Sequence, residues 1–147
     1  MTQFTIEQAV AVAAVQQLIN EWSLELDLHH GKNIATLVTE DCAYVVGDGP
    51  RQGRAAIVEF YRGIGEMMSG QTMRHLNSNL CVGFRGPDAV SITFNLLFFT
   101  TAGTGSTAPD PAAVADVRMD CRREPDGHWR ISRMDSNQPF PRAPATP

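Results

Sequence analysis

Lysine is almost absent from this chain of 147 residues: Lys32 stands alone, and arginine supplies the other positive charges. No run of basic residues occurs and the net charge is −4, which argues against non-specific nucleic-acid binding. No apolar run approaches the roughly 20 residues that a membrane-spanning helix needs. The first residues also lack the basic start and apolar stretch of a signal peptide. We therefore expect a cytoplasmic protein that binds neither nucleic acid nor membrane.

Cysteines are few and far apart. Cys42, Cys81 and Cys121 form no C-x-x-C pair, which disfavours a structural zinc site or a redox motif. We expect all three to be small buried hydrophobic residues. With 43% apolar and 19% charged residues, the composition is that of a globular protein. The length favours one domain over residues 1–138, followed by an extended, proline-rich tail over residues 139–147.

Hydrophobic periodicity predicts helices in the first half of the chain and strands in the second. From Thr5 to His29 apolar residues recur at spacings of three and four, and Gly31 would end that helix. Further elements are expected at residues 33–38 (helix), 42–46 (strand), 53–70 (helix), 73–84, 89–101, 112–124 and 129–138 (all strands). Residues 102–111 read as a mobile loop, a candidate lid. This order predicts an α+β fold in which a curved, cone-shaped antiparallel sheet wraps around three helices and encloses a pocket.

Asp27 and His75 are the candidate catalytic residues. Asp27 borders the apolar stripe of the first helix, where a carboxylate is expensive to bury without a partner. His75 lies near the start of the strand from Met73, and a neutral imidazole suits proton removal near pH 7. If the two side chains meet in one cavity, Asp27 would orient His75 as a general base. The alternative is a local structural role for each.

Polar side chains on two strands would complete the pocket. Alternation places His75, Asn77 and Asn79 on one face of the 73–84 strand, and Asp116 and Arg118 on one face of the 112–124 strand. If these faces look the same way, Arg118 or Asn77 would stabilise developing negative charge, unless Arg118 is merely solvated. The substrate-binding candidates are Arg118, Asn77, Asp116, His30, Trp22, Tyr44 and Tyr61.

A metal site built from Asp27, His30 and His75 is the remaining alternative for these side chains. Nothing else in the sequence favours it, and no glycine-rich loop has a phosphate-binding form. We therefore predict neither a metal nor a cofactor.

Five segments, taken in order, resemble the SnoaL-like family of the nuclear-transport-factor-2-like (cystatin-like) superfamily. They are Leu26-Asp27, Leu37-Val-Thr-Glu-Asp-Cys-Ala-Tyr-Val45, Gly53-Arg-Ala-Ala-Ile57, Arg74-His-Leu-Asn-Ser-Asn79 and Asp126-Gly-His-Trp-Arg-Ile131. The resemblance covers roughly residues 5–138. Scytalone dehydratase and hexachlorocyclohexane dehydrochlorinase are similar in placing an Asp and a His at the positions of Asp27 and His75. That similarity implies that His75 is the base and Asp27 its orienting partner.

Two departures set the chain apart from scytalone dehydratase. Near Thr100 there is no counterpart of that enzyme's second catalytic histidine, and Leu26 stands where it has a tyrosine. The resemblance still implies a cofactor-independent lyase or isomerase, of the dehydratase or elimination type, that acts on a small hydrophobic molecule, cyclic or polyketide-like. The alternative is a non-catalytic small-molecule-binding or subunit-assembly module of the same fold. We expect a homodimer, or a trimer, formed through the outer sheet face, with Leu80, Val82, Phe84 and apolar residues of the 89–101 strand as the candidate contacts.

Overall fold

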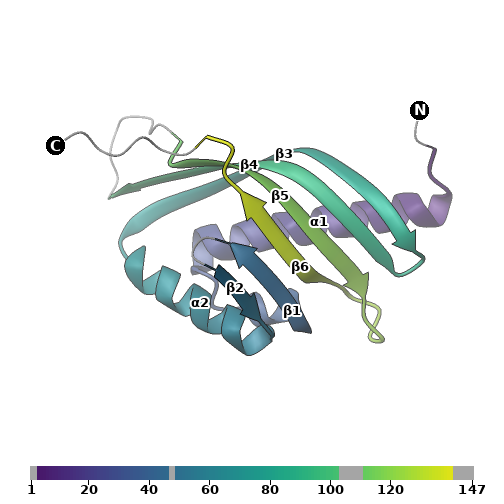
Figure 1. Ribbon diagram of the computed structural model, residues 1–147, viewed down its shortest axis with the longest axis horizontal. Helices are drawn as coiled ribbons and strands as arrows, with labels where there is room; N and C mark the ends of the chain where they lie inside the picture. Colours follow the sequence, from purple (N-terminus) through teal and green to yellow (C-terminus); the bar gives the residue numbers. More distant parts are fainter. Residues whose placement is uncertain (1–2, 47–48, 103–110, 141–147) are drawn as a thin grey trace.

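A six-stranded sheet curves across one long helix in the computed structural model (Figure 1). The structure describes residues 3–46, 49–102 and 111–140. Its elements are α1 (Ile6–His29), η1 (Ile34–Thr36), β1 (Val38–Val46), β2 (Gly49–Gln52), α2 (Arg54–Met67), β3 (Gln71–Gly86), β4 (Ala89–Ala102), β5 (Ala113–Arg123) and β6 (Trp129–Asn137). The strand order is β2-β1-β6-β5-β4-β3. The predicted α+β class with a curved sheet packed on helices is confirmed.

The start of helix α1 and its buried face agree with the sequence-based prediction. The backbone N–H of Gln8 donates to the Thr5 hydroxyl, and the backbone N–H of Thr5 donates to the Gln8 side chain, which makes a capping box. Val15, Ile19 and Trp22 lie on the face that packs against the sheet and are almost fully buried. Burial of each such side chain stabilises the fold by about 1.5–3 kcal/mol. The sheet therefore packs on the buried apolar face of α1.

The first strands differ from the sequence-based expectation. The helix expected over residues 33–38 is only the single 3₁₀ turn η1, because β-branched Val38 and Thr39 are buried and extend into β1. Where Gly47 to Pro50 were expected only to break the strand, the short strand β2 pairs antiparallel with β1. Strand β1 in turn pairs parallel with β6. The sheet is thus mixed, and two α-helices plus one turn replace the three predicted helices.

A β-bulge at Asn79 reverses the facing of residues along β3. Ser78 lies opposite Asn95, yet Cys81 lies opposite Thr93, so β3 holds one extra residue, and Asn79 adopts φ +58°. Before the bulge the odd-numbered side chains His75 and Asn77 face the helices. After it the even-numbered Leu80, Val82 and Phe84 do, and they pack against the core. The prediction that these three form an outer-face contact patch is wrong, and the predicted oligomer stays a prediction.

Two of the sequence-based predictions fall mainly on residues 103–110 and 141–147, the proposed lid and most of the tail, which lie outside the described residues. No helix within the three described ranges is both long and apolar enough to cross a membrane.

The bulge generates a stability prediction. Asn79→Val places a β-branched residue at positive φ, whereas Asn79→Gly relaxes the backbone; both variants lose the side-chain bond to Asn95. We expect the valine variant to be less stable than the glycine variant by about 1–2 kcal/mol in urea unfolding. Ser78→Val, on the exposed neighbouring position, serves as the control and should change little. Equal stability of the two Asn79 variants would contradict the bulge.

Candidate active site

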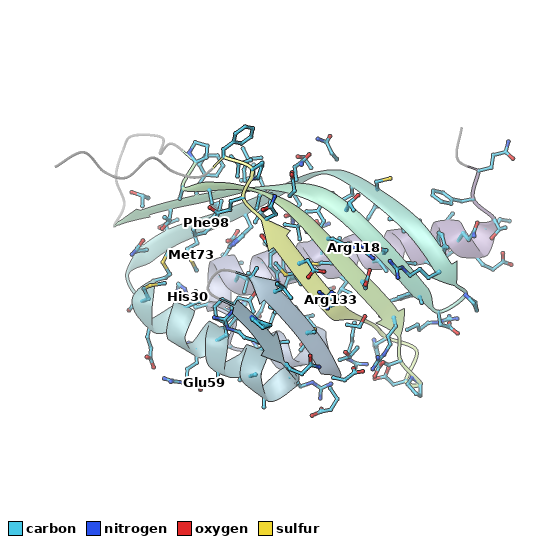
Figure 2. The ribbon with its side chains drawn as sticks, in the orientation of Figure 1. His30, Glu59, Met73, Phe98, Arg118 and Arg133 are labelled. Atoms are coloured by element: carbon cyan, nitrogen blue, oxygen red, sulfur yellow. The ribbon has the colours of Figure 1, made fainter. Side chains whose placement is uncertain are left out.

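A cavity of about 300 Å³ lies between α1, α2 and the concave face of the sheet. Its walls are mostly apolar, and the small side chains of Ala113 and Ala115 on β5 leave it room. Figure 2 shows His30, Met73 and Phe98 at the end of the sheet nearest α2. The lining residues are Trp22, Leu26, His30, Val46, Phe60, Tyr61, Ile64, Met67, Met68, Met73, His75, Leu96, Phe98, Ala113, Ala115, Met134, Ser136 and Gln138. An apolar hollow with a few polar groups is the usual form of a small-molecule site.

His75 lines this cavity, and Asp27, which is not a lining residue, contacts it. The Asp27 Oδ1 atom lies 2.6 Å from His75 Nδ1, and its Oδ2 atom accepts the His75 backbone N–H at 2.9 Å. Their side chains are only 5% and 12% exposed. An ionised carboxylate can only accept hydrogen bonds, so Nδ1 must carry the ring proton. The Nε2 lone pair is then the basic atom left for a substrate.

Aromatic rings hold the imidazole of His75 in place. The Phe98 ring centroid lies 4.7 Å from that of His75 on one side, and Trp22 approaches edge-on at 5.6 Å. Both aromatic residues also line the cavity. Because packing and hydrogen bonding both fix the ring, its Nε2 atom is preorganised for proton transfer.

Asn77 makes a different contact from the predicted one. Its side-chain N–H donates to the Ser23 hydroxyl at 2.6 Å, one turn of α1 before Asp27, and Asn77 does not line the cavity. Its buried Oδ1 atom has no hydrogen-bond partner among the described residues. Asn77 therefore fastens β3 to α1 beside the Asp27–His75 pair, a role that the sequence analysis missed. The signal was present, since Ser23 and Asp27 share one face of α1 and Asn77 and His75 share one face of β3.

Of the two tyrosines, only Tyr61 on α2 reaches the cavity. Tyr44 on β1 is fully buried behind it, with the two rings edge to face at 6.0 Å, so the predicted binding role of Tyr44 is not supported by its position. Burial raises the pKa of both hydroxyl groups well above the ordinary tyrosine value. Both phenols stay protonated at neutral pH. Tyr61 is thus a hydrogen-bond donor at the cavity wall, whereas Trp22 interacts with the hydroxyl groups of Tyr44 and Tyr61 and partly offsets the rise of their pKa values.

His30 lines the cavity from the turn after α1, as predicted. Its backbone is left-handed (φ 55°, ψ 32°), which costs a non-glycine residue about 1–2 kcal/mol. The buried Glu25 carboxylate stabilises this turn by accepting the backbone N–H of Asn33 at 2.6 Å and its side-chain N–H at 3.3 Å. The buried Nδ1 atom of the His30 ring has no hydrogen-bond partner within the part of the chain that the structure describes.

Arg118 and Asp116 lie on the opposite, outer face of the sheet. Arg118 is exposed and donates to the Ser91 hydroxyl at 3.2 Å, while Asp116 accepts from Asn95 at 2.8 Å. Figure 2 shows Arg118 on β5, away from His30 and Phe98. Apolar Ala115, Val117 and Met119 occupy the inward positions of β5. The prediction that Arg118 and Asp116 surround the pocket is therefore wrong, because burying the apolar face of β5 turns its charged face to solvent.

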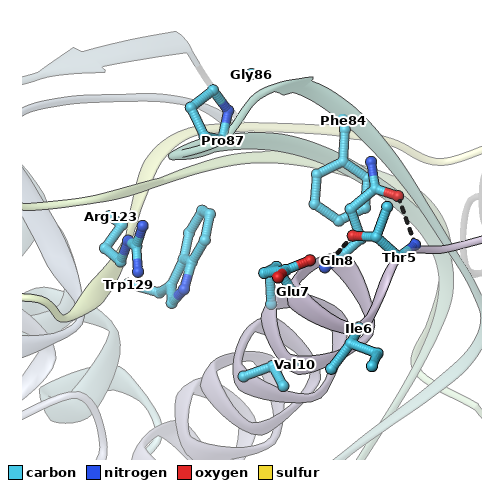
Figure 3. Close-up of a pocket in the computed structure, with 11 residues that line it drawn as sticks. Thr5, Ile6, Glu7, Gln8, Val10, Phe84, Gly86, Pro87, Arg123 and Trp129 are labelled. Carbon is cyan, nitrogen blue, oxygen red and sulfur yellow. Dashed lines mark hydrogen bonds between the residues drawn. The ribbon is translucent and has the colours of Figure 1, made fainter.

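A second hollow, of about 620 Å³, lies at the other end of the molecule, between the start of α1 and the β3–β4 turn (Figure 3). Its lining combines apolar Phe84, Pro87 and Trp129 with Glu7 and Arg123. It contains no histidine or cysteine, and Ile6 and Val10 at its edge are largely exposed. It thus lacks the carboxylate-bound histidine that borders the 300 Å³ cavity. Among the described residues, no three His, Cys, Asp or Glu side chains are grouped so that they could hold a metal ion.

The α+β fold, with a curved sheet packed on helices, is the cone-like fold of the nuclear-transport-factor-2-like class. The sequence then shows the family. Residues 7–135 match the SnoaL-like domain, and the chain belongs to that family. No curated protein matches the sequence.

Solved structures share the fold at low identity. A protein from Catenulispora acidiphila is 24% identical, with a TM-score of 0.78 over 91% of this chain and 95% of its own. A hexachlorocyclohexane dehydrochlorinase from Novosphingobium barchaimii LL02 is 17% identical, with a TM-score of 0.72 over 92% of this chain and 90% of its own. A candidate scytalone dehydratase from Novosphingobium aromaticivorans DSM 12444 is 21% identical, with a TM-score of 0.70 over 93% and 89%. The chain therefore shares its fold with proteins that are named as a dehydrochlorinase and a dehydratase.

The two bonds of Asp27 generate a spectroscopic prediction. In Asp27→Asn the amide oxygen must face the His75 backbone N–H, which can only donate, so the amide NH₂ group faces Nδ1. The ring must then accept at Nδ1 and carry its proton on Nε2. Long-range ¹H–¹⁵N correlation spectra at mildly alkaline pH should show the Nδ1–H tautomer in the wild type and the Nε2–H tautomer in the variant. The exposed His29 ring is the internal control, and an unchanged His75 tautomer would refute the assignment.

Proposed function

We propose that this protein is a cofactor-independent lyase or isomerase that removes a proton from carbon in a small hydrophobic, cyclic substrate. One observation supports this most strongly: His75 is bound at Nδ1 by a buried carboxylate, while its ring borders an apolar cavity. Such an imidazole combines a fixed tautomer with a free basic nitrogen, which is the arrangement that general-base catalysis needs.

In the proposed reaction, the substrate places an acidic C–H bond, next to a carbonyl group, against His75 Nε2. The proton passes to Nε2, and the C–H electron pair forms an enolate. Asp27 stabilises the imidazolium that results. Tyr61 can donate a hydrogen bond to the enolate oxygen from the helix side of the cavity. An elimination then expels a group from the next carbon, whereas an isomerisation returns the proton to another carbon.

The walls define the class of substrate. Leu26, Ile64, Met73 and Leu96 give an apolar surface, and a volume of about 300 Å³ is at the small end for ligand pockets. A compact ring system fits these limits better than a chain of charged groups. The named activities of two structural neighbours, on scytalone and on hexachlorocyclohexane, are eliminations from rings of this kind and support the proposal.

Proton abstraction can be tested without the natural substrate. In D₂O, we expect the wild type to exchange the α-protons of 1-tetralone, a bicyclic ketone, faster than buffer does, as followed by ¹H NMR. His75→Ala should lower this exchange by about 10²–10⁴-fold, the usual contribution of a positioned base. Asp27→Asn should also lower it strongly, because it moves the ring proton onto the reacting nitrogen.

His29→Ala is the matched control, since His29 is an exposed histidine at the end of the same helix. Equal exchange by the wild type and His75→Ala would refute the base assignment. Binding of 1-tetralone, seen by saturation-transfer NMR, without any exchange above buffer would favour the alternative of a non-catalytic binding module.

A further inference from the structure

The 300 Å³ cavity holds two histidines in different environments. His75 has a carboxylate on one ring nitrogen, which makes it a base. His30 has no hydrogen bond from its ring to a carboxylate among the described residues, and its buried Nδ1 atom is without a partner. An imidazole without an acceptor already bound to it keeps its proton available for a ligand.

Neighbouring residues fix the position of His30 at the end of α1. Its backbone is left-handed, Glu25 and Asn33 hold the turn, and α2 packs closely against it. A Cβ atom at Gly65 of α2 would lie only 3.2 Å from both the Cβ and the carbonyl oxygen of His30, so glycine at 65 makes the room. A left-handed residue is an ordinary helix ending, and here that ending, together with the packing of α2, fixes the position of His30.

His30 also borders the outside of the protein. A hollow of about 550 Å³ on the solvent side is lined by His30, Lys32, Arg62, Glu66 and Ser69. The same residue therefore borders both the inner cavity and an open, polar surface. A group in that position can give a proton inward and regain one from water.

We propose that His30 is the general acid of this site, which protonates a departing oxygen after His75 has taken a proton from carbon. The inference rests on the proposed function and makes it a dehydration. The substrate class is a β-hydroxy ketone in which the carbonyl and the hydroxyl belong to one compact ring system.

The step balances without any other reactant. The C–H bond next to the carbonyl breaks, and its proton goes to His75 Nε2. The electron pair forms the carbon–carbon double bond as the C–O bond breaks. The leaving oxygen takes a proton from the His30 ring and departs as water. His75 then loses its proton and His30 regains one, so the net reaction converts the hydroxy ketone into an unsaturated ketone and water.

Two probes that differ in the leaving group test this role. 3-Hydroxy-1-tetralone and 3-acetoxy-1-tetralone both give 1-naphthol by elimination, which is followed by fluorescence against the uncatalysed rate. Hydroxide needs a proton to leave, whereas acetate does not. We expect His30→Gly and His30→Asn to lose roughly 10²-fold or more in kcat on the hydroxy ketone, yet to retain near-wild-type kcat on the acetoxy ketone. His75→Ala should lose both activities.

The variants are chosen so that folding does not decide the result. Glycine and asparagine both tolerate the left-handed backbone at position 30, so the melting temperatures should equal or exceed that of the wild type. His29→Ala, which removes the exposed neighbouring histidine, should leave both reactions unchanged.

The outcomes separate the two proposals. If the His30 variants lose both probes equally, or neither, or if the wild type eliminates only acetate, His30 is not the acid, while the role of His75 stands. If the wild type eliminates neither probe and exchanges no α-protons, the proposed function falls, and the role of His30 with it.

Discussion

The carboxylate of Asp27 is the constraint on which the rest of the site depends. Burying a charged carboxylate costs several kcal/mol unless hydrogen bonds compensate it, and here both oxygens bond to the same residue of β3. One bond fixes the strand backbone and the other fixes the imidazole. The last turn of α1 must therefore lie over His75, and a slip of β3 by one residue would remove both bonds and turn His75 outward.

The spacing of residues made part of this geometry predictable. Four residues of a helix rise about 6 Å and two residues of a strand about 6.6 Å. Two pairs of side chains can therefore meet side by side between α1 and β3. Asp27 pairs with His75, and Ser23 pairs with Asn77. The sequence indicated the first of these pairs, since a carboxylate beside an apolar stripe requires a partner. The sequence left the second pair open, because the hydrogen bonds of an amide can be satisfied equally well by a hydroxyl group or by a ligand.

Two features could not be deduced from alternation. Periodicity shows which side chains of a strand share a face, but the choice of the inward face belongs to packing; on β5 it favours Val117 and Met119 over Arg118. Nor does periodicity reveal a bulge. A polar residue at position 79 fits a regular alternating strand, and the sequence pattern does not show that Asn79 adopts a positive φ. A single extra residue there moves Leu80 and Val82 from the predicted outer face into contact with the core.

The polar atoms around the cavity are divided between its two walls. The sheet contributes the base, His75, and Ser136 on β6, while Trp22, Tyr61 and His30 come from α1, α2 and the turn after α1. A buried donor or acceptor without a partner costs about 1–3 kcal/mol, and His30 Nδ1 has no partner among the described residues. A ligand that presents its oxygens to the helices and its acidic C–H bond to the sheet would satisfy that atom.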